Sequence, residues 1–105
     1  LWRQHGEQKN MTFELKCDEL RDLVENGGQL IDVRSSLEYS RGALKNAVNI
    51  PVDTIPHNMD SIDKSKPVML YCVSGMRASV VKQFLESLGF NYVYNLGGIS
   101  QLAHC

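Results

Sequence analysis

The sequence lacks any apolar stretch near the roughly 18–20 residues that a membrane-spanning helix needs, and it shows no secretory signal. It also lacks a basic run, because its 11 lysines and arginines are scattered among 12 acidic residues, for a net charge of −1. This balance gives no indication of a nucleic-acid or membrane partner. There is no internal repeat and no low-complexity segment. With 105 residues, 43% of them hydrophobic, the chain is expected to form one domain around one modest core.

Cysteine is scarce and odd in number, with Cys17, Cys72 and Cys105 as the three residues of this type. An odd count in a chain of this length argues against a disulfide framework. No Cys-x-x-Cys pair and no His/Cys spacing typical of zinc sites occurs, so neither a metal nor a cofactor is expected. We expect Cys17 to be a small half-buried residue at a helix start and His104-Cys105 to be the end of a frayed tail.

The first ten residues show no periodicity and do not begin with methionine. They are interpreted as a non-native tail, a linker or the stub left after removal of a signal or anchor. The sequence does not distinguish these three origins. The domain is therefore expected at residues 11–105. A cytoplasmic location is expected, with a periplasmic or membrane-anchored one as the alternative if residues 1–10 follow a signal or anchor.

Short apolar segments alternate with helical patterns along most of the chain. The expected strands are an edge strand at 13–15 and strands at 29–34, 47–50, 68–71 and 92–94. A helix is expected at 18–25, a helical turn capped by Ser35 or Ser36, and a short helix capped by Asp53 or Thr54. A further helix follows the strand at 68–71, with an apolar stripe of Val80, Val81, Phe84, Leu85 and Leu88, and the last helix is expected to be short or missing. The strands at 29–34 and 68–71 are apolar without alternation, which is typical of a buried parallel sheet. The pattern predicts an α/β fold with an open, mainly parallel sheet and helices on both faces.

A strand–loop–helix unit around Cys72 is the candidate functional site. An apolar strand ends in this cysteine, a tight loop with Gly75 follows, and a helix begins directly behind the loop. Such a unit directs backbone N–H groups and a helix N-terminus at one sulfur atom, and both favour the thiolate. Ligands of parallel sheets bind at the carboxyl ends of the strands, where Asp32 and Arg34 are also expected. Cys72 is therefore interpreted as a nucleophile.

Five segments, in this order and spacing, resemble the signature of the single-domain rhodaneses. They are Leu30-Ile31-Asp32-Val33-Arg34, Glu38-Tyr39, Gly42 with Ala47-Val48-Asn49-Ile50-Pro51, Tyr71-Cys72-Val73-Ser74-Gly75-Met76-Arg77, and Gly97-Gly98-Ile99. The resemblance extends from about Phe13 to Ile99. It implies a sulfurtransferase in which Cys72 takes a sulfane sulfur from thiosulfate, polysulfide or a persulfide and carries it as a persulfide. The acceptor would be cyanide or a thiol, either a low-molecular-weight thiol or that of a thioredoxin-like protein.

The resemblance also implies roles for the residues around the cysteine. The backbone N–H groups of the loop would surround the thiolate and then the terminal persulfide sulfur; the loop residues are Val73, Ser74, Gly75, Met76 and Arg77. Gly75 permits the tight turn, and the Ser74 hydroxyl would donate a hydrogen bond. Arg77 is expected to pair with Glu38 or Asp32, with Arg34 beside them. Asp32, Arg34 and Glu38 are interpreted as structural support, and a direct role in substrate binding is the alternative.

Two other classes of protein share this fold: enzymes that use the cysteine for a different reaction, and domains in which the cysteine is usually replaced. Cell-cycle dual-specificity phosphatases and some arsenate reductases need a Cys-x5-Arg loop, whereas Cys72 and Arg77 form Cys-x4-Arg, so this class is disfavoured. Non-catalytic docking domains usually lack the cysteine, which is present here. Two departures from the family concern local packing: Ala43 stands where many relatives have histidine, and the tryptophan usual after the Gly-Gly-Ile turn is absent.

The loop itself suggests a preference among sulfur donors. Arg77 is the one cation of the loop, since the four residues between it and Cys72 are uncharged. A doubly charged donor such as thiosulfate gains less from this loop than from one with a further cation. A polysulfide or small persulfide is therefore the expected donor.

Overall fold

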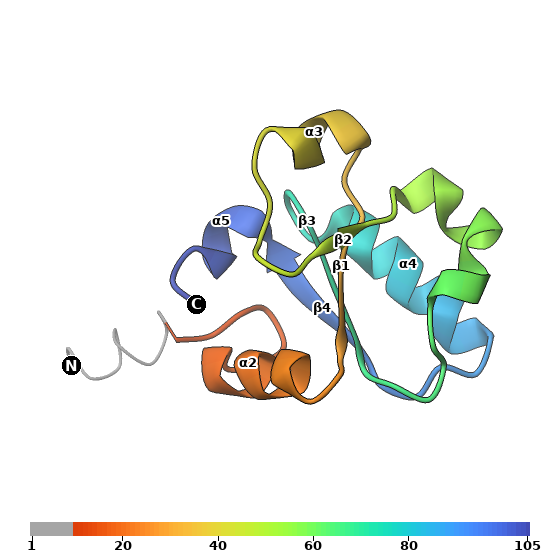
Figure 1. The fold of residues 1–105 in the computed structure, drawn as a ribbon, viewed down its shortest axis with the longest axis horizontal. Helices are drawn as coiled ribbons and strands as arrows, with labels where there is room; N and C mark the ends of the chain where they lie inside the picture. The colour runs from red at the N-terminus through yellow and green to blue at the C-terminus, as the bar shows by residue number, and fades with distance from the viewer. Residues whose placement is uncertain (1–9) are drawn as a thin grey trace.

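A four-stranded parallel sheet, in the order β2-β1-β3-β4, forms the centre of the computed structural model, which describes residues 10–105 (Figure 1). The elements are α2 (Cys17–Glu25), β1 (Gln29–Asp32), α3 (Ser36–Ser40), β2 (Val48–Asn49), the 3-10 helices η1 (Val52–His57) and η2 (Met59–Ser61), β3 (Val68–Cys72), α4 (Met76–Ser87), β4 (Val93–Gly98) and α5 (Ile99–Leu102). The expected α/β fold is confirmed. Nearly all of the tail expected at residues 1–10 lies outside the described residues.

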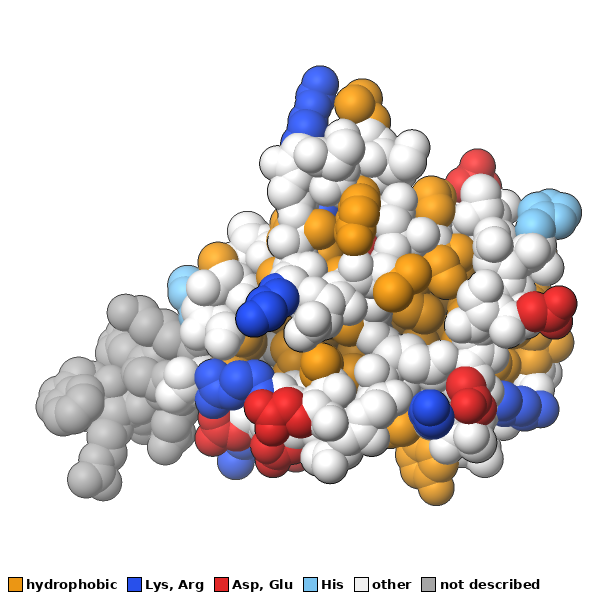
Figure 2. Space-filling model, viewed as in Figure 1, with side chains coloured by type: hydrophobic (Ala, Val, Ile, Leu, Met, Phe, Trp, Pro, Cys, Tyr) orange, Lys and Arg blue, Asp and Glu red, His pale blue; other side chains and the backbone are white. Residues whose placement is uncertain are grey.

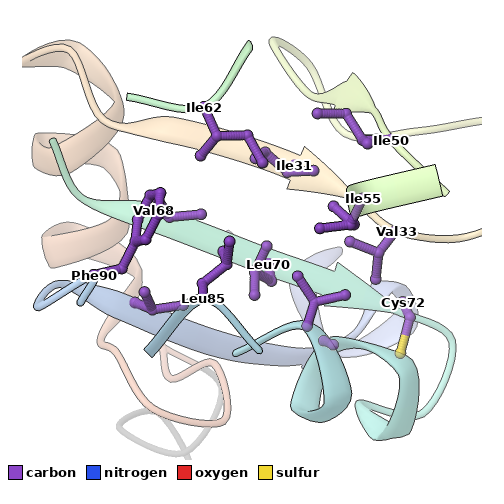
Figure 3. Packing of buried hydrophobic residues seen from close by; sticks show 13 residues of the cluster. Ile31, Val33, Ile50, Ile55, Ile62, Val68, Leu70, Cys72, Leu85 and Phe90 are labelled. Atoms are coloured by element: carbon purple, nitrogen blue, oxygen red, sulfur yellow. The ribbon is translucent and has the colours of Figure 1, made fainter. Parts of the chain in front are cut away.

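Each face of the sheet carries its own hydrophobic cluster, and β3 contributes to both. Val68, Leu70 and Cys72 face α4 and η1, as Figure 3 shows for the strand. Met69 and Tyr71 point to the opposite face, which α2 and α5 cover. All five residues of β3 are buried, as expected for a central strand of a parallel sheet. Packing on both faces of the sheet therefore fixes the position of the strand that ends in Cys72.

A capping box at the start of α3 positions one of the charged residues of the candidate site. The Ser35 hydroxyl accepts the Glu38 N–H at 3.2 Å, and the Glu38 carboxylate accepts the Ser35 N–H at 3.0 Å. Ser35 is thus the cap, of the two serines predicted. The short helix holds Glu38 on the side of the molecule where β1 and β3 end.

Residues 13–15 form a turn instead of the expected edge strand. The Thr12 hydroxyl accepts the Leu15 N–H at 2.9 Å, which closes the turn. Phe13 donates its N–H to the Leu96 carbonyl at 3.3 Å, and a single antiparallel bridge joins Met11 to Lys16. The segment therefore lies against β4 without extending the sheet.

Two further predictions about helices are wrong in detail. Neither Asp53 nor Thr54 caps the short helix, because η1 already begins at Val52, after Pro51. In α4 the buried residues are Ala78, Val81 and Leu85, whereas Val80 and Leu88 of the expected stripe are exposed. The last strand is longer than expected, since it continues through both glycines to Gly98, and the short last helix, α5, is confirmed.

Cys17 and Cys105 form a disulfide, which corrects the expectation of no disulfide and of a frayed C-terminus. The bond joins the first residue of α2 to Cys105, which follows α5. Cys17 is buried. Cys105 packs against the cluster on the α2 side of the sheet. The prediction from the odd number of cysteines was wrong because two of the three do pair, although they are 88 residues apart in the sequence. The third, Cys72, is free.

Within residues 10–105, no group of three or more His, Cys, Asp or Glu lies close enough to hold a metal ion. No helix among these residues combines the length and the apolar character needed to cross a membrane. On the face drawn in Figure 2, basic and acidic side chains are interspersed, and apolar side chains line a hollow between α2, α5 and residues 44–46.

Reducing the disulfide should destabilise the domain markedly. A cross-link that closes a loop of 88 residues is worth about 4–5 kcal/mol in the chain-entropy model. Cys17→Ser and Cys105→Ser should therefore each lower the melting temperature by more than 10 °C or so, and reductant should do the same to the wild type. Scanning calorimetry with and without reductant measures this. A melting temperature that does not respond to reductant would contradict the disulfide.

Candidate active site

Cys72 is the last residue of β3 and lies at the point where the sheet meets the N-terminus of α4. Its Sγ accepts the Gly75 N–H at 3.0 Å. The residue is 0% exposed, whereas Val73 and Met76 in the loop that follows it are 50% and 75% exposed. The sulfur is therefore closed to solvent in this conformation, and a reagent needs a local movement of the structure to reach it.

The loop directs its donors in a specific way. Gly75 has φ +91°, a left-handed conformation that favours glycine, and this turns its N–H toward the sulfur. Met76 donates its N–H to the Ser74 Oγ at 3.4 Å, so that hydroxyl accepts a hydrogen bond here. The sequence analysis predicted that the N–H groups of the loop surround the sulfur, and among the described hydrogen bonds the Gly75 N–H does contact it. The roles assigned to Val73, Ser74, Met76 and Arg77 stay predictions.

The four predicted charged residues form two separate pairs. Arg77 binds Glu38 through two hydrogen bonds, of 2.7 and 3.1 Å, and both side chains are 35% exposed. Arg34 binds Asp32 at 2.7 Å in a buried pair and also donates to the Gly42 carbonyl at 2.7 Å. Both pairs lie at the carboxyl edge of the sheet, as expected. Because each cation is compensated by a carboxylate, the site has little net positive charge to offer.

The pairing shifts several protonation equilibria. The hydrogen bond from Arg77 is the main cause that lowers the pKa of Glu38 to about 2, and the Ser35 N–H adds to it. The same pair raises the pKa of Arg77, and the hydrogen bond to Asp32 raises the pKa of Arg34. Burial raises the pKa of Tyr71 to about 12, although its hydroxyl accepts the Leu44 N–H at 3.1 Å. All these groups therefore keep their ordinary charge at neutral pH.

β4 packs against the loop that follows Cys72, and the sequence analysis did not predict this contact. Between β3 and β4 the register runs from Leu70 opposite Asn95 to Cys72 opposite Gly98, so β4 has one extra residue there. This is a β-bulge beside the candidate nucleophile. At Gly98 any Cβ would collide with the Val73 carbonyl oxygen. The signal was available in principle, as two adjacent glycines and one asparagine interrupt an apolar strand.

An open cavity of about 330 Å³ lies next to the candidate site. Its lining comes from the start of α3, from η1 and from Arg77 of α4; the residues are Val33, Ser35, Ser36, Pro51, Val52, Asp53, Thr54 and Arg77. Cys72 is not part of this lining. The cavity therefore gives space beside Arg77, at the end of the loop.

Together, the parallel sheet and the cysteine loop at its carboxyl edge define an α/β domain built to hold one buried thiol at a helix N-terminus. The model of the rhodanese-like domain matches residues 16–105, so the chain belongs to the rhodanese-like domain family. The resemblance seen in the sequence is confirmed.

Individual relatives agree with this membership. A tRNA uridine(34) hydroxylase of Yersinia pestis (strain Pestoides F) is 31% identical over 102 residues, which are 90% of this chain and 29% of that protein. The human single-domain sulfurtransferase TSTD1 is 27% identical, with a TM-score of 0.68, over 82% of this chain and 90% of that one. A rhodanese-like domain protein of Staphylococcus aureus is 35% identical, with a TM-score of 0.69, over 80% and 84%. The chain spans less than a third of the length of the hydroxylase, whereas it covers 84% and 90% of the two solved proteins.

The Glu38–Arg77 pair should make stability depend on pH below about 5. The pKa of Glu38 is about 2 in the folded protein against an ordinary 4.5, so its contribution is complete above pH 4.5 and disappears as the pH falls toward 2. Glu38→Gln should melt a few degrees lower than wild type at pH 7, and the difference should close near pH 2. Melting curves of both proteins from pH 2 to 7 measure this. A difference that is constant with pH would contradict the assignment.

Proposed function

We propose that this domain is a sulfurtransferase that carries sulfane sulfur as a persulfide on Cys72. The observation that carries the proposal is the single free cysteine at the carboxyl end of β3, with its Sγ held by the Gly75 N–H at 3.0 Å at the start of α4. Membership of the rhodanese-like family and the likeness to a solved sulfurtransferase support it.

The reaction is a pair of displacements at sulfur. The Cys72 thiolate attacks the outer sulfur of the donor, the S–S bond of the donor breaks, and the leaving group departs with the electron pair: sulfite from thiosulfate, a polysulfide shortened by one sulfur from polysulfide, or a thiolate from a persulfide. The acceptor thiolate, or cyanide, then attacks the terminal sulfur of the Cys72 persulfide. The Cys72 S–S bond breaks, and Cys72 leaves again as the thiolate. No external oxidant or reductant is needed, because each step transfers one sulfane sulfur from a leaving group to a nucleophile.

The loop supplies the electrostatic part of this mechanism. A backbone N–H directed at the sulfur stabilises negative charge in a site where no solvent must reorganise. The N-terminal end of α4, a helix of 12 residues, adds its dipole in the same direction. Arg77 adds less than its charge suggests, because Glu38 binds it through two hydrogen bonds. The acceptor is proposed to be a small thiol or the thiol of a thioredoxin-like protein.

The rival activities make different demands on the same site. A phosphatase needs the arginine of its loop to bind phosphate, whereas here Glu38 holds Arg77. A docking domain needs no reactive cysteine. The tRNA hydroxylation named for the Yersinia relative belongs to a protein of which this chain covers 29%.

The disulfide bears on the compartment in which the domain works. Structural disulfides persist in oxidising compartments and are rare in the cytoplasm. We therefore favour an extracytoplasmic location over the cytoplasmic one expected from the sequence. The proposed location depends on the Cys17–Cys105 bond, so the calorimetric comparison with and without reductant is the first test of its premise.

Intact mass spectrometry tests the persulfide directly. The protein, with the disulfide intact, is briefly exposed to thiosulfate or polysulfide and its mass is compared with that of Cys72→Ser. We expect one added sulfur, about 32 Da, on the wild type alone, and loss of that mass after addition of a thiol. Absence of an adduct with both donors would favour the docking domain. Hydrolysis of an aryl phosphate by the wild type would favour the phosphatase.

The compensated charges predict which donor is better. Thiosulfate carries two negative charges and meets an arginine that Glu38 already neutralises, so it gains little from the loop. We expect kcat/KM for polysulfide or a small persulfide to exceed that for thiosulfate by tenfold or more. Steady-state sulfur transfer with both donors at one ionic strength measures the ratio. A higher kcat/KM with thiosulfate would contradict the prediction.

A further inference from the structure

Asn95 is a buried polar residue in the middle of β4, and the mechanism above does not use it. It is 5% exposed and lies opposite Leu70 of β3, two residues before the end of that strand. A buried amide in an otherwise apolar strand is costly unless its donors and acceptors are satisfied. Its partners therefore indicate why the residue is there.

The Asn95 side chain makes two hydrogen bonds, and one of them reaches the loop. Its Nδ2 donates to the Gly75 carbonyl at 3.0 Å. Its Oδ1 accepts the Gly97 N–H at 2.8 Å. Gly97 has φ +84° and belongs to the bulge opposite Cys72. One amide thus joins the bulge of β4 to the residue whose N–H contacts the sulfur.

The backbone of Asn95 is fixed as well. Its N–H donates to the Glu14 carboxylate at 2.6 Å, and the same carboxylate pairs with Lys82 of α4 at 2.9 Å. Glu14 lies in the turn that packs along β4, so a segment remote in sequence anchors Asn95 from outside. The result is a continuous set of contacts from Lys82 through Glu14 and Asn95 to Gly75.

Gly75 is held at both of its polar atoms by this arrangement. Its carbonyl accepts from Asn95 and from the Ser79 N–H, the latter at 2.9 Å, while its N–H donates to the Cys72 Sγ. The two donors on the carbonyl fix the plane in which Gly75 is joined to Met76. Since Gly75 has no side chain to anchor it and a left-handed φ, its orientation depends on these backbone contacts.

We propose that Asn95 is a positioning residue for sulfur transfer, which holds Gly75 so that its N–H stays directed at the sulfur of Cys72. This inference rests on the proposed function of Cys72 as the sulfur carrier. Asn95 does not touch the sulfur. Its effect passes through the Gly75 carbonyl, so its loss should weaken the stabilisation of negative charge on sulfur more than it weakens substrate binding.

The test compares Asn95→Ala and Asn95→Leu with wild type. Both substitutions remove both hydrogen bonds of the amide without adding a charge near the sulfur, and leucine also keeps the approximate volume of the side chain. Alkylation of the free thiol by iodoacetamide is measured from pH 5 to 10, together with kcat and KM for polysulfide. Both variants should move the midpoint of the alkylation profile upward by roughly half a pH unit or more. Both should lower kcat by about tenfold and leave KM within about twofold.

Asn58→Ala is the matched control. Asn58 also donates its amide to a backbone carbonyl, that of Thr54 at 2.8 Å, but it stands between η1 and η2, outside the loop and β4. This variant should lose thermal stability while its alkylation profile stays that of wild type.

The readouts separate the two proposals. An Asn95→Leu protein that folds, melts lower and keeps the wild-type alkylation profile would overturn the role of Asn95. If Asn95→Ala does not fold, the leucine variant, which leaves no cavity of that size, decides the question. Failure of the wild type to form a persulfide would overturn the proposed function, while the alkylation profiles would still report on Asn95.

Discussion

The contact between the Gly75 N–H and the Cys72 Sγ is the interaction on which the site depends. It requires a left-handed residue three positions after the cysteine, and therefore a glycine there. It also requires that another part of the chain support the loop from behind. β4 provides this support by a bulge and by Gly98, at which a side chain would collide with the loop carbonyl of Val73. The fold thus brings the backbones of β4 and of the loop into close contact next to the free thiol of Cys72.

Charge compensation is the second constraint. Each arginine near the site has a carboxylate partner, and one of these pairs, Asp32–Arg34, is almost fully buried. A buried pair of this kind is costly to break, and it ties the end of β1 to the loop that contains Gly42. The charges therefore mainly fix the geometry of the carboxyl edge. The Cys72 sulfur itself is contacted by the Gly75 N–H and lies at the start of α4, and no side-chain cation is bonded to it among the described residues.

The architecture and the position of Cys72 followed from the sequence because local signals determine both. Unbroken apolar strands predict a parallel sheet, and a cysteine between a strand and a helix predicts a thiol at the carboxyl edge. The Ser35 cap could be predicted for the same reason, whereas the Glu38–Arg77 pair, which joins residues 39 apart, was one of two pairings expected from the family resemblance. The contacts missed are non-local. Nothing near Glu14 or Asn95 in sequence indicates that they meet, and a pairing of Cys17 with Cys105 across the chain has no local signature.

The disulfide also changes the chemistry expected of Cys72. The chain has three cysteines, and two of them are joined on the α2 side of the sheet, whereas Cys72 belongs to the cluster on the α4 side. Within residues 1–105, a persulfide on Cys72 would thus meet no other free thiol as long as the disulfide is intact. The proposed transfer would then use an acceptor outside this segment. The four loop residues between Cys72 and Arg77 are uncharged, and Arg77 is paired with Glu38, so an anionic acceptor would gain little from charge at this loop.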